Sequence, residues 1–256
     1  MNTDLLDIGG HRFKSRFILG SGKFSLDMTR TVIENGGVEM ATLAVRRANV
    51  GGMENILDYI PEGITVLPNT SGARNADEAV RIAELARELG CGDFVKIEII
   101  RDTKYLLPDN AETTKAIARL KAKDFVILPY MMPDLSAARD MEEAGADAIM
   151  PLGAPIGSNK GLLTKDFIKI LVDEIDLPII VDAGIGRPSQ ACEAMELGVD
   201  AIMANTAIAT ADDPAIMAKA FKMSIEAGRL AYLSGPGRVL ENKGEASSPL
   251  TGFLEE

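Results

Sequence analysis

Three observations in the 256-residue sequence predict a single closed (β/α)8 barrel, the TIM barrel fold. Short apolar runs occur eight times, and their first residues lie 22 to 31 positions apart, which leaves room for a strand, a helix and two short loops each time. Segments with helical periodicity separate the runs. The runs are nearly continuous in apolar residues, as is typical of parallel strands that are covered by helices.

The eight apolar runs are the predicted strands, in chain order. They are FILGSG (17–22), MATLAV (40–45), TVLPNT (65–70), FVKIEII (94–100), FVILPYM (125–131), AIMPLG (148–153), IIVDAG (179–184) and AIMANT (201–206).

Helices are predicted between these runs. Residues 76–90 place apolar side chains on one face and charges on the other, and Gly90 is a helix stop signal. Residues 135–146 and 189–200 have the same periodicity, and Ser189 is the expected N-cap of the last segment.

No change in composition divides the chain, so we expect one domain over residues 1–256, with strand–helix units from about 17 to 232. The segment from about 233 to 256 is rich in Gly, Ser and Pro and has little helical periodicity. It is expected to be an irregular C-terminal arm, and a candidate to open and close over the barrel mouth.

Composition narrows the class of protein. The formal net charge of -11 disfavours binding to phosphate backbones and to anionic lipid surfaces. No apolar run approaches a membrane-spanning length, and the first residues do not resemble a signal peptide, so we expect a cytoplasmic protein with neither nucleic acid nor membrane as partner. With two isolated cysteines, Cys91 and Cys192, and His11 as the one histidine, no tight metal site is expected.

Polar or glycine-rich loops follow the last three predicted strands, where parallel barrels carry their active sites. They are GAPIGSNKG (153–161), DAGIGRP (182–188) and NTAIATADDP (205–214). Gly184 and Gly186 allow close backbone approach to a ligand, and Asn205 with Thr206 presents polar groups at a helix start. Together the loops predict a phosphate site.

Two charges stand inside the fourth predicted strand. Lys96 and Glu98 share one face of that strand, so both side chains can point into the barrel. A desolvated lysine can lose its proton and form an imine with a ketone, and Glu98 and Asp182 can then move protons. A purely structural Lys–Glu pair is the alternative for Lys96 and Glu98, and Asp182 could instead tie loop amides together. Arg46 and Arg47 could hold an anion or form ion pairs.

These motifs, in this order, resemble the bacterial thiazole synthase family, which builds the thiazole ring of thiamine. The resemblance runs from about residue 7 to 252 and is carried by SRFILGSGKF, LAVRRAN, LPNTSG, VKIEII, MPLGAPIGS, DAGIG, NTAIATADDP and EAGRLAYLSG.

The resemblance implies a barrel enzyme, a transferase, that condenses 1-deoxy-D-xylulose 5-phosphate, dehydroglycine and sulfur. The sulfur is carried as a thiocarboxylate on a small ubiquitin-like carrier protein, and neither a metal nor a bound redox cofactor is required. The imine-forming lysine falls on Lys96, and the acid/base carboxylates fall on Glu98 and Asp182. The sugar-phosphate contacts fall on Gly157, Ala183, Gly184, Asn205 and Thr206.

Two other functions fit the same residues. An imine-forming sugar-phosphate aldolase would also use a barrel lysine with a phosphate loop, and a barrel that only binds a phosphorylated ligand would form no imine. We further expect a homo-oligomer, a dimer or a tetramer. Arg101, Asn159 and Lys160 depart from the family's glycine-rich pattern, and the departures bear on loop motion and on docking of the carrier.

Overall fold

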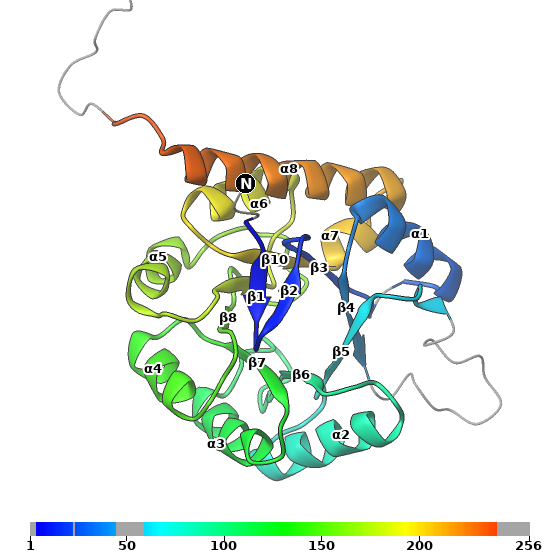
Figure 1. Cartoon of the computed structure of the whole chain (residues 1–256), viewed down its shortest axis with the longest axis vertical. Helices are drawn as coiled ribbons and strands as arrows, with labels where there is room; N and C mark the ends of the chain where they lie inside the picture. Colours follow the sequence, from blue (N-terminus) through cyan, green and yellow to red (C-terminus); the bar gives the residue numbers. More distant parts are fainter. Residues whose placement is uncertain (1–3, 23, 45–58, 240–256) are drawn as a thin grey trace, which may run out of the picture.

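The computed structural model describes residues 4–22, 24–44 and 59–239, and within these ranges the predicted barrel is confirmed (Figure 1). Eight parallel strands lie in the order β8-β7-β6-β5-β4-β3-β10-β9. Single bridges, Ile149 to Ile179 and Leu152 to Asp182, connect β8 to β9 and close the ring. The strands are β3 (Phe17–Gly20), β4 (Met40–Ala44), β5 (Thr65–Asn69), β6 (Phe94–Ile97), β7 (Val126–Met131), β8 (Met150–Pro151), β9 (Ile180–Asp182) and β10 (Ala201–Ala204).

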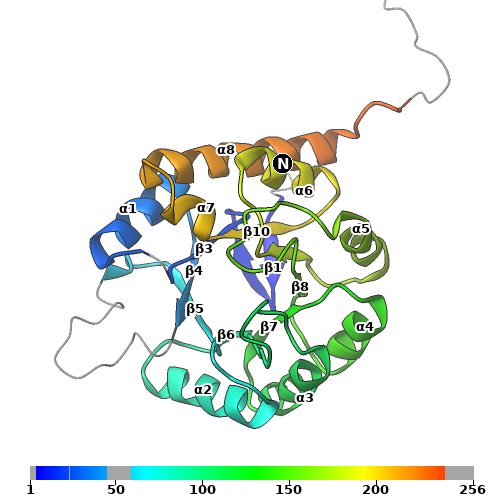
Figure 2. The ribbon, with the colours of Figure 1, turned by 180° about the vertical axis from the view of Figure 1, so that it is seen from behind.

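Helices surround the strands in both views down the barrel (Figures 1 and 2). They are α1 (Leu26–Gly36), α2 (Ala76–Glu88), α3 (Asn110–Lys121), α4 (Leu135–Glu143), α5 (Lys165–Glu174), α6 (Pro188–Glu196), the short α7 (Thr206–Ala209) and α8 (Pro214–Ser234). No helix in the described ranges is long and apolar enough to cross a membrane.

The helix α2 shows how the sequence sets these elements. The side chain of Asn75 accepts a hydrogen bond from the Glu78 N–H and caps the start, while Gly90 beyond the end has φ of +85°. The face toward the strands is buried and consists of Ala76, Ala79, Val80, Ala83 and Ala86. Small side chains there let the helix lie close to the sheet.

Two expected boundaries differ from the structure. The helix α6 begins two residues earlier than expected, at Pro188 with Arg187 as N-cap, so Ser189 is not the cap. Pro188 starts a helix well because its ring fixes φ and its missing N–H would have no helical partner. The helix α8 continues to Ser234, two residues into the range expected for the arm. Residues 235–239 have no regular structure, and residues 240–256 lie outside the described ranges.

An antiparallel hairpin, β1 (Leu6–Ile8) and β2 (His11–Phe13), was not expected from the sequence. It crosses the end of the barrel that faces the viewer in Figure 1. Its apolar residues Leu6, Ile8 and Phe13 pack with the inward side chains of the strands, including Phe94 at the start of β6. The hairpin therefore closes the barrel at the amino-terminal ends of the strands and leaves the opposite end, seen in Figure 2, for a site.

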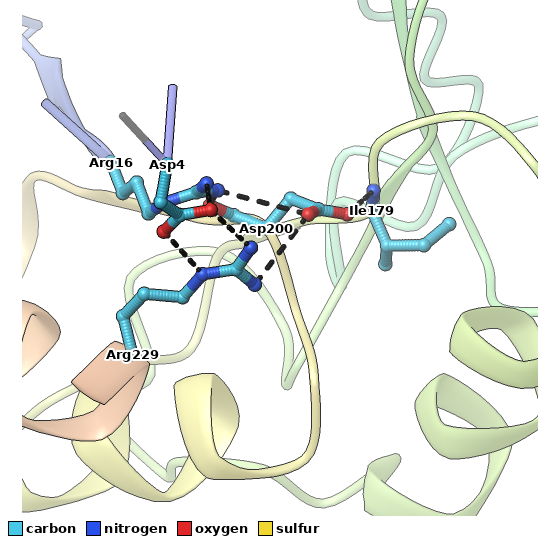
Figure 3. A network of polar contacts seen from close by, with 5 residues as sticks. All are labelled: Asp4, Arg16, Ile179, Asp200 and Arg229. Carbon is cyan, nitrogen blue, oxygen red and sulfur yellow. Dashed lines mark hydrogen bonds and ion pairs between the residues drawn. The ribbon is translucent and has the colours of Figure 1, made fainter. Parts of the chain in front are cut away.

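Four charged residues bind one another at this closed end, and we call them the lower cluster (Figure 3). They are Asp4, Arg16, Asp200 and Arg229. The Asp4 carboxylate accepts hydrogen bonds from both arginines at 2.8–2.9 Å. Asp200 accepts a hydrogen bond from the N–H of Ile179 at 3.0 Å, so the cluster connects the N-terminus, two strands and α8.

Candidate functional site

A cavity of about 320 Å³ lies at the carboxyl ends of the strands. In a parallel barrel this end carries the active site, because the eight loops that follow the strands converge there. All eight site residues predicted from the sequence line the cavity: Lys96, Glu98, Gly157, Asp182, Ala183, Gly184, Asn205 and Thr206. The predicted anion ligands Arg46 and Arg47 lie outside the described residues.

Lys96 lies at the centre of the charged part of the cavity. Its side chain is 3% exposed, and its Nζ contacts the Asp182 carboxylate and lies 3.4 Å from Oε2 of Glu98. The strand β6 aligns Lys96 with Asn69 of β5 on one side and with Leu128 of β7 on the other. Because inward side chains alternate along a strand, the same register sends Phe94, Lys96 and Glu98 into the barrel. We call Lys96, Glu98 and Asp182 the upper cluster.

The pKa of Lys96 is shifted upward. Burial alone would lower the pKa of its amine, but the charges of Asp182 and Glu98 outweigh burial and raise that pKa above the ordinary value. The two carboxylates therefore favour the ammonium form of Lys96. Burial also raises the pKa of Asp182, and the neighbouring ammonium opposes that shift.

Asp182 ends β9 and is followed by an unusual turn. Ala183 has φ of +68°, a left-handed conformation that non-glycine residues seldom adopt, and its N–H donates a hydrogen bond to the Asp182 carboxylate. Gly184 follows with φ of +84°. Two successive left-handed residues turn the backbone sharply across the cavity, which brings Ala183 and Gly184 into its lining.

Packing and backbone conformation both favour glycine at position 184. A Cβ atom there would meet the backbone nitrogen and the Cβ of Ala154, in the loop after β8. The two loops also share hydrogen bonds, because Gly161 N–H donates to the Gly184 carbonyl at 2.7 Å. The loops after β8 and β9 are thus built as one unit, with Gly157 exposed at its edge.

The third predicted loop begins with Asn205, which precedes the one-turn helix α7. A Cβ at Gly20 of β3 would meet the Asn205 side chain, so this glycine makes room for the asparagine. The Oδ1 atom of Asn205 is buried and has no hydrogen-bond partner among the described residues. A buried acceptor of this kind is satisfied when a ligand or water donates to it.

The structure places the three residues that were expected to depart from the family pattern, Arg101, Asn159 and Lys160. Arg101 forms an ion pair with Asp109, the N-cap of α3, and does not line the cavity. Asn159 does line it, and its backbone oxygen lies where a Cβ on Gly186 would stand. Lys160 is exposed.

Tyr130 lies behind the cavity lining, against Lys96, and sequence reasoning missed it. It lies on β7 beside β6, it is fully buried, and the Lys96 Nζ lies 5.1 Å from the centre of its ring. The residues Thr42, Asn69 and Ser71 line the cavity without having been predicted. For Asn69 and Ser71 the available signal was their position at and just after the end of β5, because polar residues at barrel strand ends face the site.

The sequence of the chain also matches known proteins. Residues 7–249 match the family described as "Thiazole biosynthesis protein ThiG". The chain is 70% identical to thiazole synthase of Clostridium beijerinckii over 100% of both proteins, and 64% identical to that of Fusobacterium nucleatum over 98% of each.

Solved structures also align with the chain. A crystal structure of the Amycolatopsis orientalis BexX/CysO complex aligns with a TM-score of 0.83 and 32% identity, covering 92% of this chain and 98% of the other. A mandelate oxidase aligns with a TM-score of 0.64 at 16% identity, over 90% of this chain and 78% of the other, which is a likeness of fold alone.

Proposed function

The chain belongs to the thiazole synthase family, enzymes of thiamine biosynthesis, and we propose that it forms thiazole phosphate through an imine on Lys96. The proposed inputs are 1-deoxy-D-xylulose 5-phosphate, dehydroglycine and sulfur from a thiocarboxylated carrier protein. The observation that carries the proposal is the upper cluster, a buried lysine amine at the floor of a cavity between two carboxylates.

The first step attaches the sugar to Lys96. The amine nitrogen attacks the ketone carbon, a C–N bond forms, and the carbonyl oxygen leaves as water. Because the ammonium cannot attack, it must first give up a proton, and the Asp182 carboxylate in contact with it is the nearest acceptor. The raised pKa of Asp182 makes it a better base for this task than an ordinary aspartate.

The later steps move protons at neighbouring carbons. Tautomerisation moves the carbonyl to the adjacent carbon, where the thiocarboxylate sulfur replaces the carbonyl oxygen and the carrier leaves with that oxygen as its carboxylate. A neighbouring hydroxyl group is then eliminated as water, and condensation with dehydroglycine, whose nitrogen displaces the Lys96 amine, closes the ring. Glu98 directly follows β6 and Asp182 ends β9, so they approach the bound sugar from two directions. Two carboxylates in different positions suit proton removal at one carbon and delivery at the next.

We assign the sugar phosphate to the loops after β8, β9 and β10. Gly157, Ala183, Gly184, Asn205 and Thr206 would contact it. The left-handed turn at Ala183 and Gly184 supports the assignment, since such turns point backbone N–H groups toward an anion.

We propose a carrier protein as the sulfur donor that docks at the open barrel end. Support comes from the solved relative at 32% identity, whose structure is a complex of two proteins, BexX and CysO. The hairpin β1–β2 blocks the other end, so a thiocarboxylated chain terminus would enter from the carboxyl ends of the strands.

We also propose that the enzyme is a homo-oligomer in which a second copy covers α8. Ile216, Met223 and Leu230 recur every seven residues along this helix and are 61–68% exposed. A seven-residue apolar repeat is the pattern by which helices pair along their length. Light scattering should report a smaller assembly for Met223→Glu than for the wild type, while an equal mass for both would contradict this interface.

One experiment tests the central proposal. The protein is incubated with 1-deoxy-D-xylulose 5-phosphate and borohydride, and mass spectrometry locates the reduced adduct. We expect it on the peptide that contains Lys96, and thiazole phosphate only after thiocarboxylated carrier and dehydroglycine are added. Cleavage of the sugar without carrier would indicate an aldolase, and absence of any adduct would indicate a binding protein; either result contradicts the proposal.

A further inference from the structure

Tyr130 has a hydroxyl that the fold leaves without a partner. The side chain points into the barrel from β7 and is 0% exposed. Its Oη atom makes no hydrogen bond within the described ranges. A buried hydroxyl without a partner destabilises a protein, and phenylalanine would fill the same space without that cost. Packing therefore accounts for the ring but not for the hydroxyl.

The ring lies against the cation of the upper cluster. Lys96 Nζ is 5.1 Å from the ring centre, within the range of a cation–π contact. The same nitrogen contacts Asp182 and lies 3.4 Å from Glu98. Burial raises the pKa of Tyr130, and the charges of Asp182 and Glu98 raise it further, so its hydroxyl keeps its proton and remains a donor.

The proposed reaction changes the number of donors beside these carboxylates. A lysine ammonium offers three N–H donors, whereas a protonated imine on the same nitrogen offers one. When Lys96 condenses with the ketone, two donors are lost next to two buried carboxylates. Among the described groups at this position, Tyr130 holds a donor that no other residue uses.

We propose that Tyr130 is a positioning residue for the imine chemistry: its ring holds the cationic nitrogen of Lys96, and its hydroxyl donates to Asp182 once the imine has formed. This inference rests on the proposed function. Asp182 is the chosen acceptor because it contacts the Lys96 amine and raises the pKa of Tyr130 more than Glu98 does. The charged groups of the cavity lining that face Asp182 are Lys96 and Glu98.

Tyr130→Phe tests the hydroxyl alone. We expect the variant to form the borohydride-trapped adduct to the wild-type extent but to convert it to thiazole phosphate about tenfold more slowly. A donated hydrogen bond stabilises the charged carboxylate, so its loss raises the pKa of Asp182 in the imine state. The acidic limb of the turnover–pH profile should therefore move to higher pH, an effect that a packing role would not produce.

Thr113→Val is the matched control. Thr113 is also fully buried with an unpartnered hydroxyl, but it lies on the outer helix α3, whereas Tyr130 contacts Lys96. Both variants should melt at or above the wild-type temperature, and Thr113→Val should keep wild-type turnover. Tyr130→Leu, which removes the ring as well, should also slow adduct formation.

The outcomes separate the two proposals. Wild-type turnover and an unshifted pH profile in Tyr130→Phe, with a normal Lys96 adduct in the wild type, would overturn the role of Tyr130 and leave the proposed function standing. A wild type that forms no Lys96 adduct would overturn both.

Discussion

The two ends of the barrel each hold a cluster of charges, and the clusters differ in burial and in charge balance. The lower cluster has two arginines and two aspartates, so its charges cancel, and hydrogen bonds of 2.8–2.9 Å join Asp4 to both arginines (Figure 3). The upper cluster has one amine for two carboxylates. Tyr130, whose hydroxyl has no partner among the described residues, contacts it, and Asn205, whose Oδ1 has none, lines the same cavity.

This difference in charge balance fits a structural role for the lower cluster and a chemical role for the upper cluster. A balanced, hydrogen-bonded cluster has no group left over to react, and it connects segments far apart in the chain. An unbalanced cluster keeps a base available and a cation whose proton can move. The comparison agrees with the general division of such barrels, in which the amino-terminal face serves stability and the carboxyl-terminal face serves catalysis. Substitutions in the upper cluster should therefore lower turnover, whereas substitutions in the lower cluster should lower stability and leave turnover per folded molecule unchanged.

The largest expected effect comes from Lys96→Arg. Arginine preserves the positive charge between the carboxylates but cannot form the imine, so turnover should fall by about 10⁴-fold or more, as it does when other covalent nucleophiles are removed. The measurement is thiazole phosphate formation together with borohydride trapping. Lys165→Arg, at an exposed ion pair with Glu193, is the control and should keep full activity. An adduct that persists in Lys96→Arg would place the nucleophile elsewhere.

The next effect comes from Asp182→Asn, which removes the carboxylate that most raises the pKa of Lys96. Because the amine then loses its proton more easily, the pH profile of adduct formation should move to lower pH. Turnover should still fall, by about 100-fold, since the proposed base is gone. Glu98→Gln should shift the profile in the same direction by less. A profile that stays in place or moves upward would contradict the coupling between these groups.

Sequence reasoning predicted the upper cluster because its residues stand at strand ends, where side-chain alternation and barrel topology fix their direction. Lys96 and Glu98 share a strand face, and Asp182 ends a strand whose apolar run is plain. The charge state of Lys96 could not be predicted, since it depends on contact with Asp182, 86 positions away in the chain. Tyr130 was missed because its unused hydroxyl is visible only in the packed barrel.

The lower cluster had no sequence signal. Asp4 and Arg229 lie 225 positions apart, and each could as well be a surface charge. The hairpin that follows Asp4 has strands of three residues, which are too short to show the alternation by which strands are recognised. Tertiary contacts alone create both features.

A smaller effect, on stability, is expected from Arg16→Met. Arg16 is 7% exposed, and its removal leaves Asp4 and Asp200 with one arginine between them. We expect unfolding free energy to fall by roughly 2 kcal/mol, less than for a fully buried pair because both aspartates are partly exposed. Turnover per folded molecule should not change. Arg12→Met, at an exposed pair with Asp7, should cost under about 0.5 kcal/mol. Lost turnover in folded Arg16→Met would contradict the assignment of stability to one end of the barrel and catalysis to the other.

The smallest expected effect is the contribution of Asp4 to the pH dependence of the free energy of unfolding. Its hydrogen bond to Arg229 and the charges of Arg16 and Arg229 lower its pKa below the ordinary value of 3.8, although burial opposes the shift. A carboxylate with a depressed pKa stabilises the fold above its unfolded pKa and loses that contribution as pH falls through the folded pKa.

Asp4→Asn should therefore unfold about 1 kcal/mol more easily than the wild type at pH 7, as expected for a partly exposed pair. The two proteins should converge in urea titrations as the pH falls below about 4. Asp7→Asn, on the hairpin that follows Asp4, is the control and should unfold about as easily as the wild type. A difference for Asp4→Asn that persisted unchanged into acid would mean that the shape of the side chain, rather than its charge, joins the N-terminal segment to α8.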